Sequence, residues 1–79
     1  MKRFVTHVRK DTQGNIIFIK TIETTLNILE AVNRINKLID YFYVSDGFSE
    51  VAVAVYDEKW LRTHANGKWT DNLDNLPRF

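Results

Sequence analysis

The chain has 79 residues, of which 44% are hydrophobic and 13% aromatic, so it can form one domain with a core and is not expected to be disordered. It contains no cysteine. This excludes disulfides and thiolate metal sites and favours a cytoplasmic location, since small secreted domains usually need disulfides.

The first 22 residues predict an antiparallel β-hairpin. Residues 3–10 alternate as a strand does, and residues 16–22, rich in isoleucine, form a second strand. Between them, Asp11 and Gly14 have the positions expected in a turn that closes with a left-handed glycine. Strict alternation in the first strand places Phe4, Thr6 and Val8 on one face. It places Val5 on the opposite face.

An amphipathic helix is predicted next. Asn27 is a suitable N-cap, and Glu30 three positions later completes a capping box. Apolar residues then recur at helical spacing, namely Ile28, Ala31, Val32, Ile35, Leu38 and Ile39. The end of the helix is open, because Phe42 continues this stripe and would extend the helix to Tyr43. The aromatic and branched residues 41–45 favour a strand instead, and we prefer the strand.

The second half of the chain predicts two more strands and a tail. Residues 50–56 alternate valine with alanine, and residues 60–64 form a last short strand. Residues 69–79 predict an irregular tail that docks on the body through Leu73 and Leu76.

The predicted elements follow the order strand, strand, helix, strand, strand, with one extra strand if residues 41–45 are extended. This order is typical of an α+β fold. We expect a small antiparallel sheet with one helix packed on one face, within a single domain of residues 1–79.

Three stretches together resemble a family of small bacterial and phage proteins: residues 5–11 with Gly14, residues 26–32, and residues 60–77. The most specific motif is Asn72-Leu73-Asp74-Asn75-Leu76-Pro77, whereas Trp60 and Thr63 stand where that family usually has tyrosine and serine. The family is known only as a domain of unknown function. The resemblance therefore implies a fold and a bacterial or phage origin, but no activity, substrate or cofactor.

Residues for catalysis and metal binding are scarce. His7 and His64 are the only histidines, and their spacing fits no metal-binding motif. The sequence has no phosphate-binding glycine loop and no nucleophile motif, and so short a chain has little room for a catalytic cleft. We therefore expect no enzyme, no cofactor and no metal. No apolar stretch approaches the length of a membrane span, so no membrane partner is expected either.

These features favour a protein-interaction module that forms a homodimer or binds another protein. The aromatic content is high for one helix to cover, and a sheet with one helix leaves a face or an edge that needs a cover. Residues 1–20 are mainly basic and residues 40–58 acidic, which offers complementary patches. Given the resemblance, a phage or bacterial protein that regulates a host protein would fit.

The alternative is that a basic, aromatic face of the sheet binds single-stranded nucleic acid. An exposed aromatic residue beside arginines is a common way to hold unpaired bases. The candidate binding residues are Arg9, Lys10, Trp60, Arg62 and His64. Against this alternative stand the net charge of only +1 and the tendency of tryptophan to lie in a core.

Overall fold

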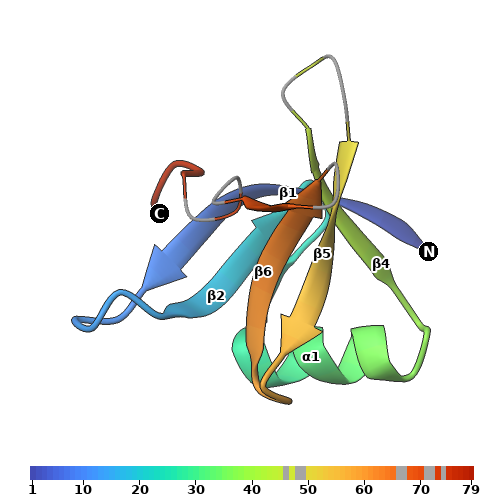
Figure 1. Cartoon of the computed structure of the whole chain (residues 1–79), viewed down its shortest axis with the longest axis horizontal. Coiled ribbons are helices and arrows are strands. Elements are labelled where there is room, and N and C mark those ends of the chain that lie inside the picture. The colour runs from blue at the N-terminus through green and yellow to red at the C-terminus, as the bar shows by residue number, and fades with distance from the viewer. Residues whose placement is uncertain (46, 48–49, 66–67, 71–72, 74) are drawn as a thin grey trace.

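The computed structural model describes residues 1–45, 47, 50–65, 68–70, 73 and 75–79. These residues form seven strands and one helix (Figure 1). In chain order they are β1 (Lys2–Lys10), β2 (Ile16–Thr21), β3 (Thr25–Asn27), α1 (Ile28–Asn36), β4 (Tyr41–Ser45), β5 (Glu50–Tyr56), β6 (Trp60–Ala65) and β7 (Lys68–Thr70). The α+β class is confirmed, and so is the preference for a strand at residues 41–45. The predicted order of elements is wrong, because the short strands β3 and β7 were missed.

The described strands form a mixed sheet in the order β3-β2-β1-β4-β5-β6-β7. β1 runs parallel to β4, whereas every other neighbouring pair is antiparallel. The prediction of a wholly antiparallel sheet is therefore wrong. The cause is the helix. α1 crosses from β3, past β2, to the far side of β1, and a crossover connection of this kind allows β4 to run parallel to β1.

β1 bends strongly, because its register against β2 shifts between Val5 and His7 and again between Arg9 and Lys10. Its first residues pair with β4, and the rest pairs with β2. A shift of this kind breaks the alternation of side chains. Val5 and Val8, three positions apart, are consequently both fully buried, although strict alternation placed them on opposite faces.

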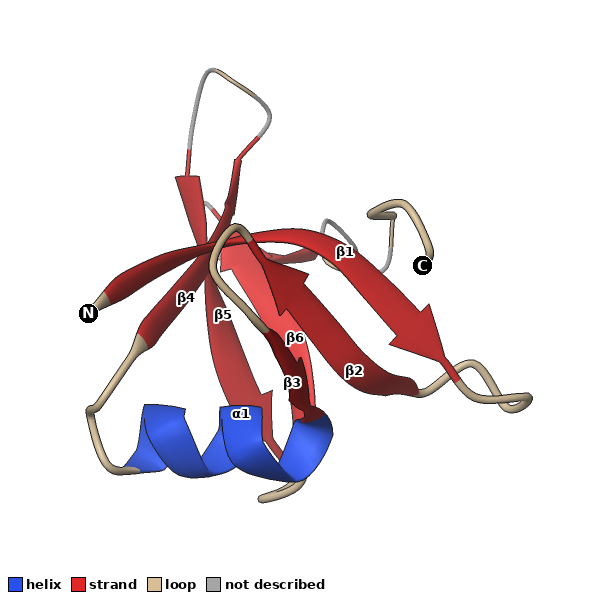
Figure 2. Cartoon of the chain, turned by 180° about the vertical axis from the view of Figure 1, so that it is seen from behind, coloured by secondary structure: helices blue, strands red, loops and turns tan. Residues whose placement is uncertain are grey.

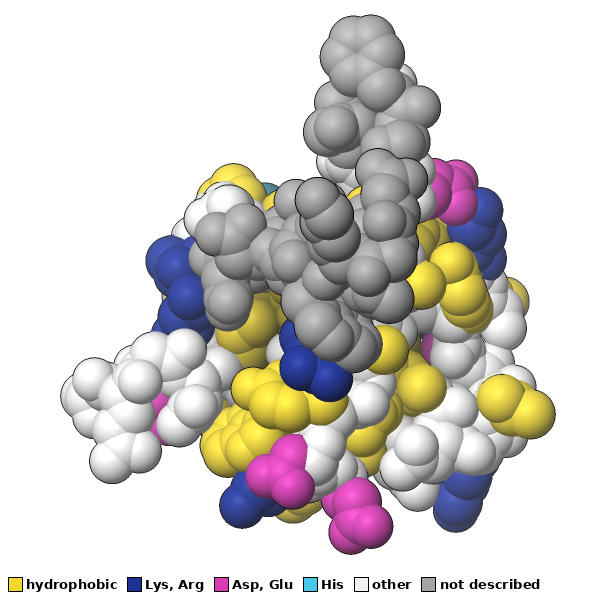
Figure 3. All heavy atoms as spheres, in the orientation of Figure 1, with side chains coloured by type: hydrophobic (Ala, Val, Ile, Leu, Met, Phe, Trp, Pro, Cys, Tyr) yellow, Lys and Arg dark blue, Asp and Glu magenta, His cyan; other side chains and the backbone are white. Residues whose placement is uncertain are grey.

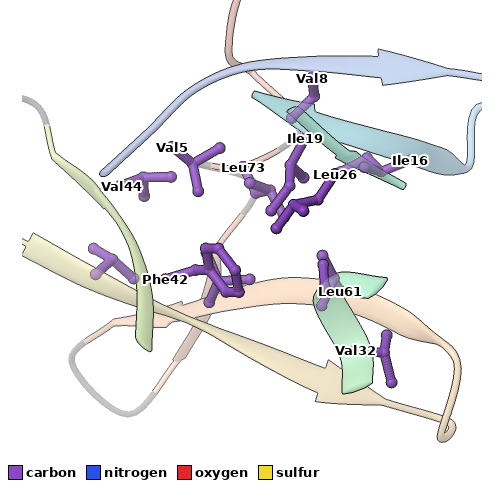
Figure 4. Packing of buried hydrophobic residues seen from close by; sticks show 13 residues of the cluster. Val5, Val8, Ile16, Ile19, Leu26, Val32, Phe42, Val44, Leu61 and Leu73 are labelled. Atoms are coloured by element: carbon purple, nitrogen blue, oxygen red, sulfur yellow. The ribbon is translucent and has the colours of Figure 1, made fainter. Parts of the chain in front are cut away.

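The bent sheet encloses the core between its two halves. Figure 4 shows Ile19 of β2 pointing towards Phe42 of β4 and Leu61 of β6 across the interior, and all three are buried. The helix α1 contacts β2 and β3 as well as β5 and β6, and it buries Ala31 and Val32. It therefore closes one end of the curled sheet instead of lying on one face of a flat one (Figures 1 and 2).

The start of α1 is as predicted. Oδ1 of Asn27 accepts a hydrogen bond from the backbone N–H of Glu30 at 2.8 Å, so Asn27 is the N-cap. This bond satisfies one of the backbone donors that have no partner within the first helical turn.

The end of α1 differs from the prediction. Leu38 has a φ of 59°, Ile39 N donates to Arg34 O at 2.9 Å, and Leu38 N donates to Ile35 O at 3.1 Å. These two bonds form a Schellman motif, which ends the helix. The predicted continuation of the apolar stripe through Leu38 and Ile39 is wrong, because both side chains are exposed.

The tail runs from β6 to β1. Leu73 is only 1% exposed, and its backbone N–H donates to Oγ1 of Thr63 on β6 at 3.4 Å. Further along, the backbone N–H of Val8 donates to the carbonyl oxygen of Pro77 at 3.0 Å. The tail thus pairs with β1 beyond the point where β4 leaves it. The strand β7 includes residues 69–70, and residues 71, 72 and 74 of the predicted tail lie outside the described residues.

Candidate binding surfaces

The structure separates the binding residues that the sequence suggested. Arg9 and Lys10 lie on β1, whereas Trp60, Arg62 and His64 lie on β6, and these strands are not neighbours in the sheet. The side chain of His64 lies outside the described residues. The two groups therefore belong to two different surfaces.

The first surface, which we call the basic face, lies on the outer side of β1 and β2 and consists of His7, Arg9, Phe18, Lys20 and Phe79. In the β1–β2 register, His7 lies opposite Lys20, and Arg9 lies opposite Phe18. Phe79 covers this pair of strands, because Nε of Arg9 donates to its backbone oxygen at 3.0 Å. These contacts place the end of the tail on the outer side of the hairpin.

Cations and aromatic rings alternate on the basic face. The guanidinium of Arg9 lies 4.8 Å from the ring centroid of Phe79 and 5.8 Å from that of Phe18. Nζ of Lys20 lies 5.9 Å from the Phe79 centroid, and the ring of His7 meets Phe79 edge-on at 6.5 Å. Contacts of this kind favour a cation over a ring face electrostatically.

Among the described residues, acidic side chains do not balance the cations of the basic face. No Asp or Glu side chain in that part of the chain pairs with Arg9 or Lys20. At the other end of the same strand, Lys2 pairs with Glu50 at 2.6 Å, and Arg3 pairs with Glu23 at 3.3 Å. In the described part of the chain, acidic side chains therefore pair with Lys2 and Arg3 at the start of β1 but not with Arg9 or Lys20.

The second surface is a hollow of about 290 Å³ between the β1–β2 turn and the β5–β6 hairpin. Trp60 and Arg62 line it together with Tyr56, whose ring lies 4.6 Å from the guanidinium of Arg62. Trp60 is half-buried, so it lines this hollow and does not belong to the core. Figure 3 shows hydrophobic, basic and acidic side chains crowded around the β5–β6 turn at the lower edge of the view.

That turn brings negative charge close to the hollow. Asp57 and Glu58 form the turn with φ angles of 51° and 60°, which suits a tight hairpin. Both side chains are exposed. The hollow that contains Trp60 and Arg62 is therefore of mixed charge, unlike the basic face.

A third surface, which we call the apolar end, consists of Met1, Leu38, Ile39 and Tyr41. All four side chains are exposed, and Leu38 is exposed to 90%. The backbone keeps them together, because Tyr41 N donates to Met1 O at 2.7 Å. Beside them is an open hollow of about 190 Å³, whose lining includes Met1, Leu38 and Tyr41 as well as Phe42 and Val53 from the core.

A buried ionic cluster supports the apolar end. The side chain of Asp40 is 1% exposed, and its two oxygens lie 2.8 Å from Nη1 of Arg34 and 3.1 Å from Nε of Arg3. Burial acts to raise the pKa of the Asp40 carboxyl, but Arg34 and Arg3 outweigh it and hold this pKa below its usual value. The cluster joins α1, β1 and the start of β4.

The sequence did not indicate the roles of Phe79 in the basic face and of Leu38 in the apolar end. Phe79 was assigned only to an irregular tail, and nothing in the local pattern indicates that it returns to β1. Leu38 was assigned to the apolar stripe of the predicted helix. One signal bears on this: residues 37–40 include no glycine, so a left-handed cap at the end of the helix would fall on another residue.

The described residues contain no group of three or more His, Cys, Asp or Glu side chains that could hold a metal ion. Nor do they form a helix with the length and apolar character needed to cross a bilayer.

Comparison with known proteins agrees with the resemblance seen in the sequence. The family described as protein of unknown function (DUF3892) matches residues 4–77. No curated protein and no solved structure matches the chain. Since the match extends over nearly all 79 residues, the chain belongs to the DUF3892 family, a family of unknown function.

Proposed function

We propose that this domain is a protein-interaction module whose apolar end binds a second copy of the same chain. The observation that carries the proposal is the conformation of Leu38, which combines a left-handed backbone with a side chain that is 90% exposed. The proposed partner is a second copy of the chain. Binding of a different protein to the same surface is the competing outcome of the test.

The backbone of Leu38 is unfavourable for leucine. A left-handed conformation costs an L-residue roughly 1–2 kcal/mol, and glycine normally occupies this position of a Schellman motif. The exposed side chain of Leu38 contributes little to the core that could offset this cost. Departures from local preference of this kind gather at functional sites, and burial against a partner would supply the missing compensation.

The apolar end also carries a projection and a hollow side by side. A twofold interface is self-complementary, because each contact from one copy to the other occurs twice. Leu38 projects next to the hollow of about 190 Å³ that it helps to line. This volume is below the range of roughly 300–1,000 Å³ typical of small-molecule pockets, and it suits a single apolar side chain, such as Leu38 of the second copy.

The residues beneath the apolar end are held firmly. Asp40, between Ile39 and Tyr41, is fixed by Arg34 and Arg3. A surface whose backbone is already fixed loses less conformational freedom when a partner binds. The ionic cluster therefore supports a preformed interface at this end of the fold.

The test measures molar mass by light scattering over a wide range of protein concentrations, for the native chain and for Leu38→Gly. Glycine suits the left-handed position, so this variant should fold at least as well as the native chain. Leu29→Ala is the matched control, because Leu29 is a similarly exposed leucine, 72% accessible, outside the apolar end.

We expect the native chain and Leu29→Ala to reach the mass of a dimer as concentration rises, whereas Leu38→Gly stays monomeric. A native chain that remains monomeric throughout would overturn the homodimer and leave another protein as the occupant of the surface. A dimer that persists in Leu38→Gly would show that the apolar end is not the interface.

A further inference from the structure

The basic face offers a binding site that is separate from the apolar end. Among the described residues, Arg9 lies near the rings of Phe18 and Phe79 and Lys20 lies near that of Phe79, and neither cation has an acidic side chain as a partner. The side chains of Arg9 and Lys20 are exposed, and those of Phe18 and Phe79 are half-buried. The surface therefore presents positive charge and ring area together.

We propose that the basic face binds single-stranded nucleic acid. In this proposal Arg9 and Lys20 contact phosphates, and Phe79 stacks with a base. Proteins that hold single strands without sequence preference combine such cations with aromatic rings, because every base has a face on which to stack.

The geometry favours a single strand over other polyanions. A duplex hides its bases and would use only the charges, and a polyanionic peptide without aromatic residues, such as polyglutamate, has no ring to stack on Phe79. Both cations lie over the ring of Phe79, with the Arg9 guanidinium at 4.8 Å and Nζ of Lys20 at 5.9 Å from its centroid. A strand that stacks on this ring would bring its backbone phosphates close to both cations.

The hollow beside Trp60 is a weaker candidate for the same ligand. It contains Arg62 and two aromatic residues, but the exposed carboxylates of Asp57 and Glu58 lie in the adjoining turn and would repel phosphates. Of the residues that the sequence suggested for nucleic-acid binding, Arg9 therefore belongs to the proposed site. Phe79 takes the stacking role that was expected of Trp60.

The experiment titrates a fluorescently labelled oligothymidylate with the full chain and follows anisotropy at several salt concentrations. Two phosphate contacts to a single strand predict a slope of about −1.4 in the plot of log affinity against log salt. The double variant Arg9→Gln, Lys20→Gln should bind about tenfold or more weakly and should flatten this slope. Two single variants complete the comparison. Arg9→Gln removes one positive charge from the basic face, and its matched control Lys37→Gln removes one positive charge elsewhere.

A second pair of variants isolates stacking from charge. Phe79→Leu keeps an apolar side chain but removes the ring, so affinity should fall by about fivefold or more, whereas Phe79→Tyr should bind as the native chain does. A thermal melt of each variant establishes that the fold is kept. If Phe79→Leu binds normally, the stacking role is wrong and so is the proposal in this form.

Three further results would overturn the proposal: no binding even at low salt, equal loss of affinity in Lys37→Gln and Arg9→Gln, or equal competition by a DNA duplex or by polyglutamate. Because Leu38→Gly leaves the basic face intact, it should bind the oligonucleotide as well as the native chain does. The homodimer and the nucleic-acid site can therefore fail independently.

Discussion

Arg34 in the last turn of α1 and Asp40 just before β4 form an ion pair of 2.8 Å across the end of the helix. The carboxylate is almost completely buried, and Arg3 of β1 reaches it from the other side at 3.1 Å. The two arginines therefore compensate a charge that would be very unfavourable in the interior alone. This cluster fixes the position of α1 relative to the strands that it crosses.

The ion pairs of Asp40 predict a loss of stability in acid. Because the pKa of its carboxyl is lower in the folded protein, Asp40 stabilises the fold fully above its unfolded pKa of about 3.9. That contribution is lost as the pH falls through the lower pKa of the folded state. The free energy of unfolding from urea titrations should therefore change little from neutral pH to about pH 5 and fall below about pH 4.

The variant Asp40→Asn tests the cause of this pH dependence. It leaves Arg3 and Arg34 without their shared carboxylate, so the melting temperature at neutral pH should fall by about 5 °C or more. Its stability should also decline less steeply in acid. Asp11→Asn is the comparison, because hydrogen bonds from Asn15 and Gln13 lower the pKa of Asp11 as well, on an exposed turn. A profile for Asp40→Asn identical to that of the native chain would contradict this assignment.

Leu73 predicts that the tail contributes to stability. Replacing it with alanine would leave a cavity between β1 and β6, which should lower the free energy of unfolding by about 3 kcal/mol. Leu76 packs on the core but is only half-buried, so Leu76→Ala should cost about 1 kcal/mol. Urea midpoints of both variants check this order. An unchanged midpoint in Leu73→Ala would mean that the tail is not docked in solution.

Leu38→Gly should stabilise the monomer. The substitution removes the unfavourable left-handed conformation of leucine, and the gain should be about 1 kcal/mol after the greater flexibility of glycine in the unfolded chain is subtracted. The measurement is a thermal or urea melt at a concentration where the native chain is monomeric. A lower midpoint than that of the native chain would show that the side chain of Leu38 packs on its own domain.

Asn27 predicts the cost of losing the helix cap. Asn27→Ala removes the acceptor for the N–H of Glu30 and should lower the free energy of unfolding by about 1 kcal/mol. Asn33→Ala, on the exposed side of the same helix, should instead be neutral or slightly stabilising, because alanine favours the helix. Equal effects of the two substitutions would argue against capping.

The sequence was sufficient where local rules decide the structure. The Asn27 cap, the turn at Asp11 to Gly14 and the strand at residues 41–45 each follow from a few neighbouring residues, and all three are present. The hydrogen bond from Gly14 N to Asp11 O, at 3.1 Å, is the turn that the two residues predicted.

Features that depend on distant parts of the chain were missed. The register shifts in β1 put Val5 and Val8 on one side, and no pattern within that strand indicates them. The parallel pairing of β1 with β4 depends on where α1 leads the chain. The basic face likewise requires Phe79 to lie on a strand from the other end of the sequence, so Arg9 was the only one of its residues that was recognised as a binding residue.

The hydrogen bond between Val8 and Pro77 joins segments separated by nearly the whole chain. During synthesis, β1 therefore leaves the ribosome long before the tail residue Pro77, with which it pairs, has been made. Until then one side of β1 presents unpaired backbone groups, the kind of edge to which other polypeptides add. Folding should accordingly be slow for so small a domain, and synthesis that stops short of Pro77 should leave a chain prone to aggregate.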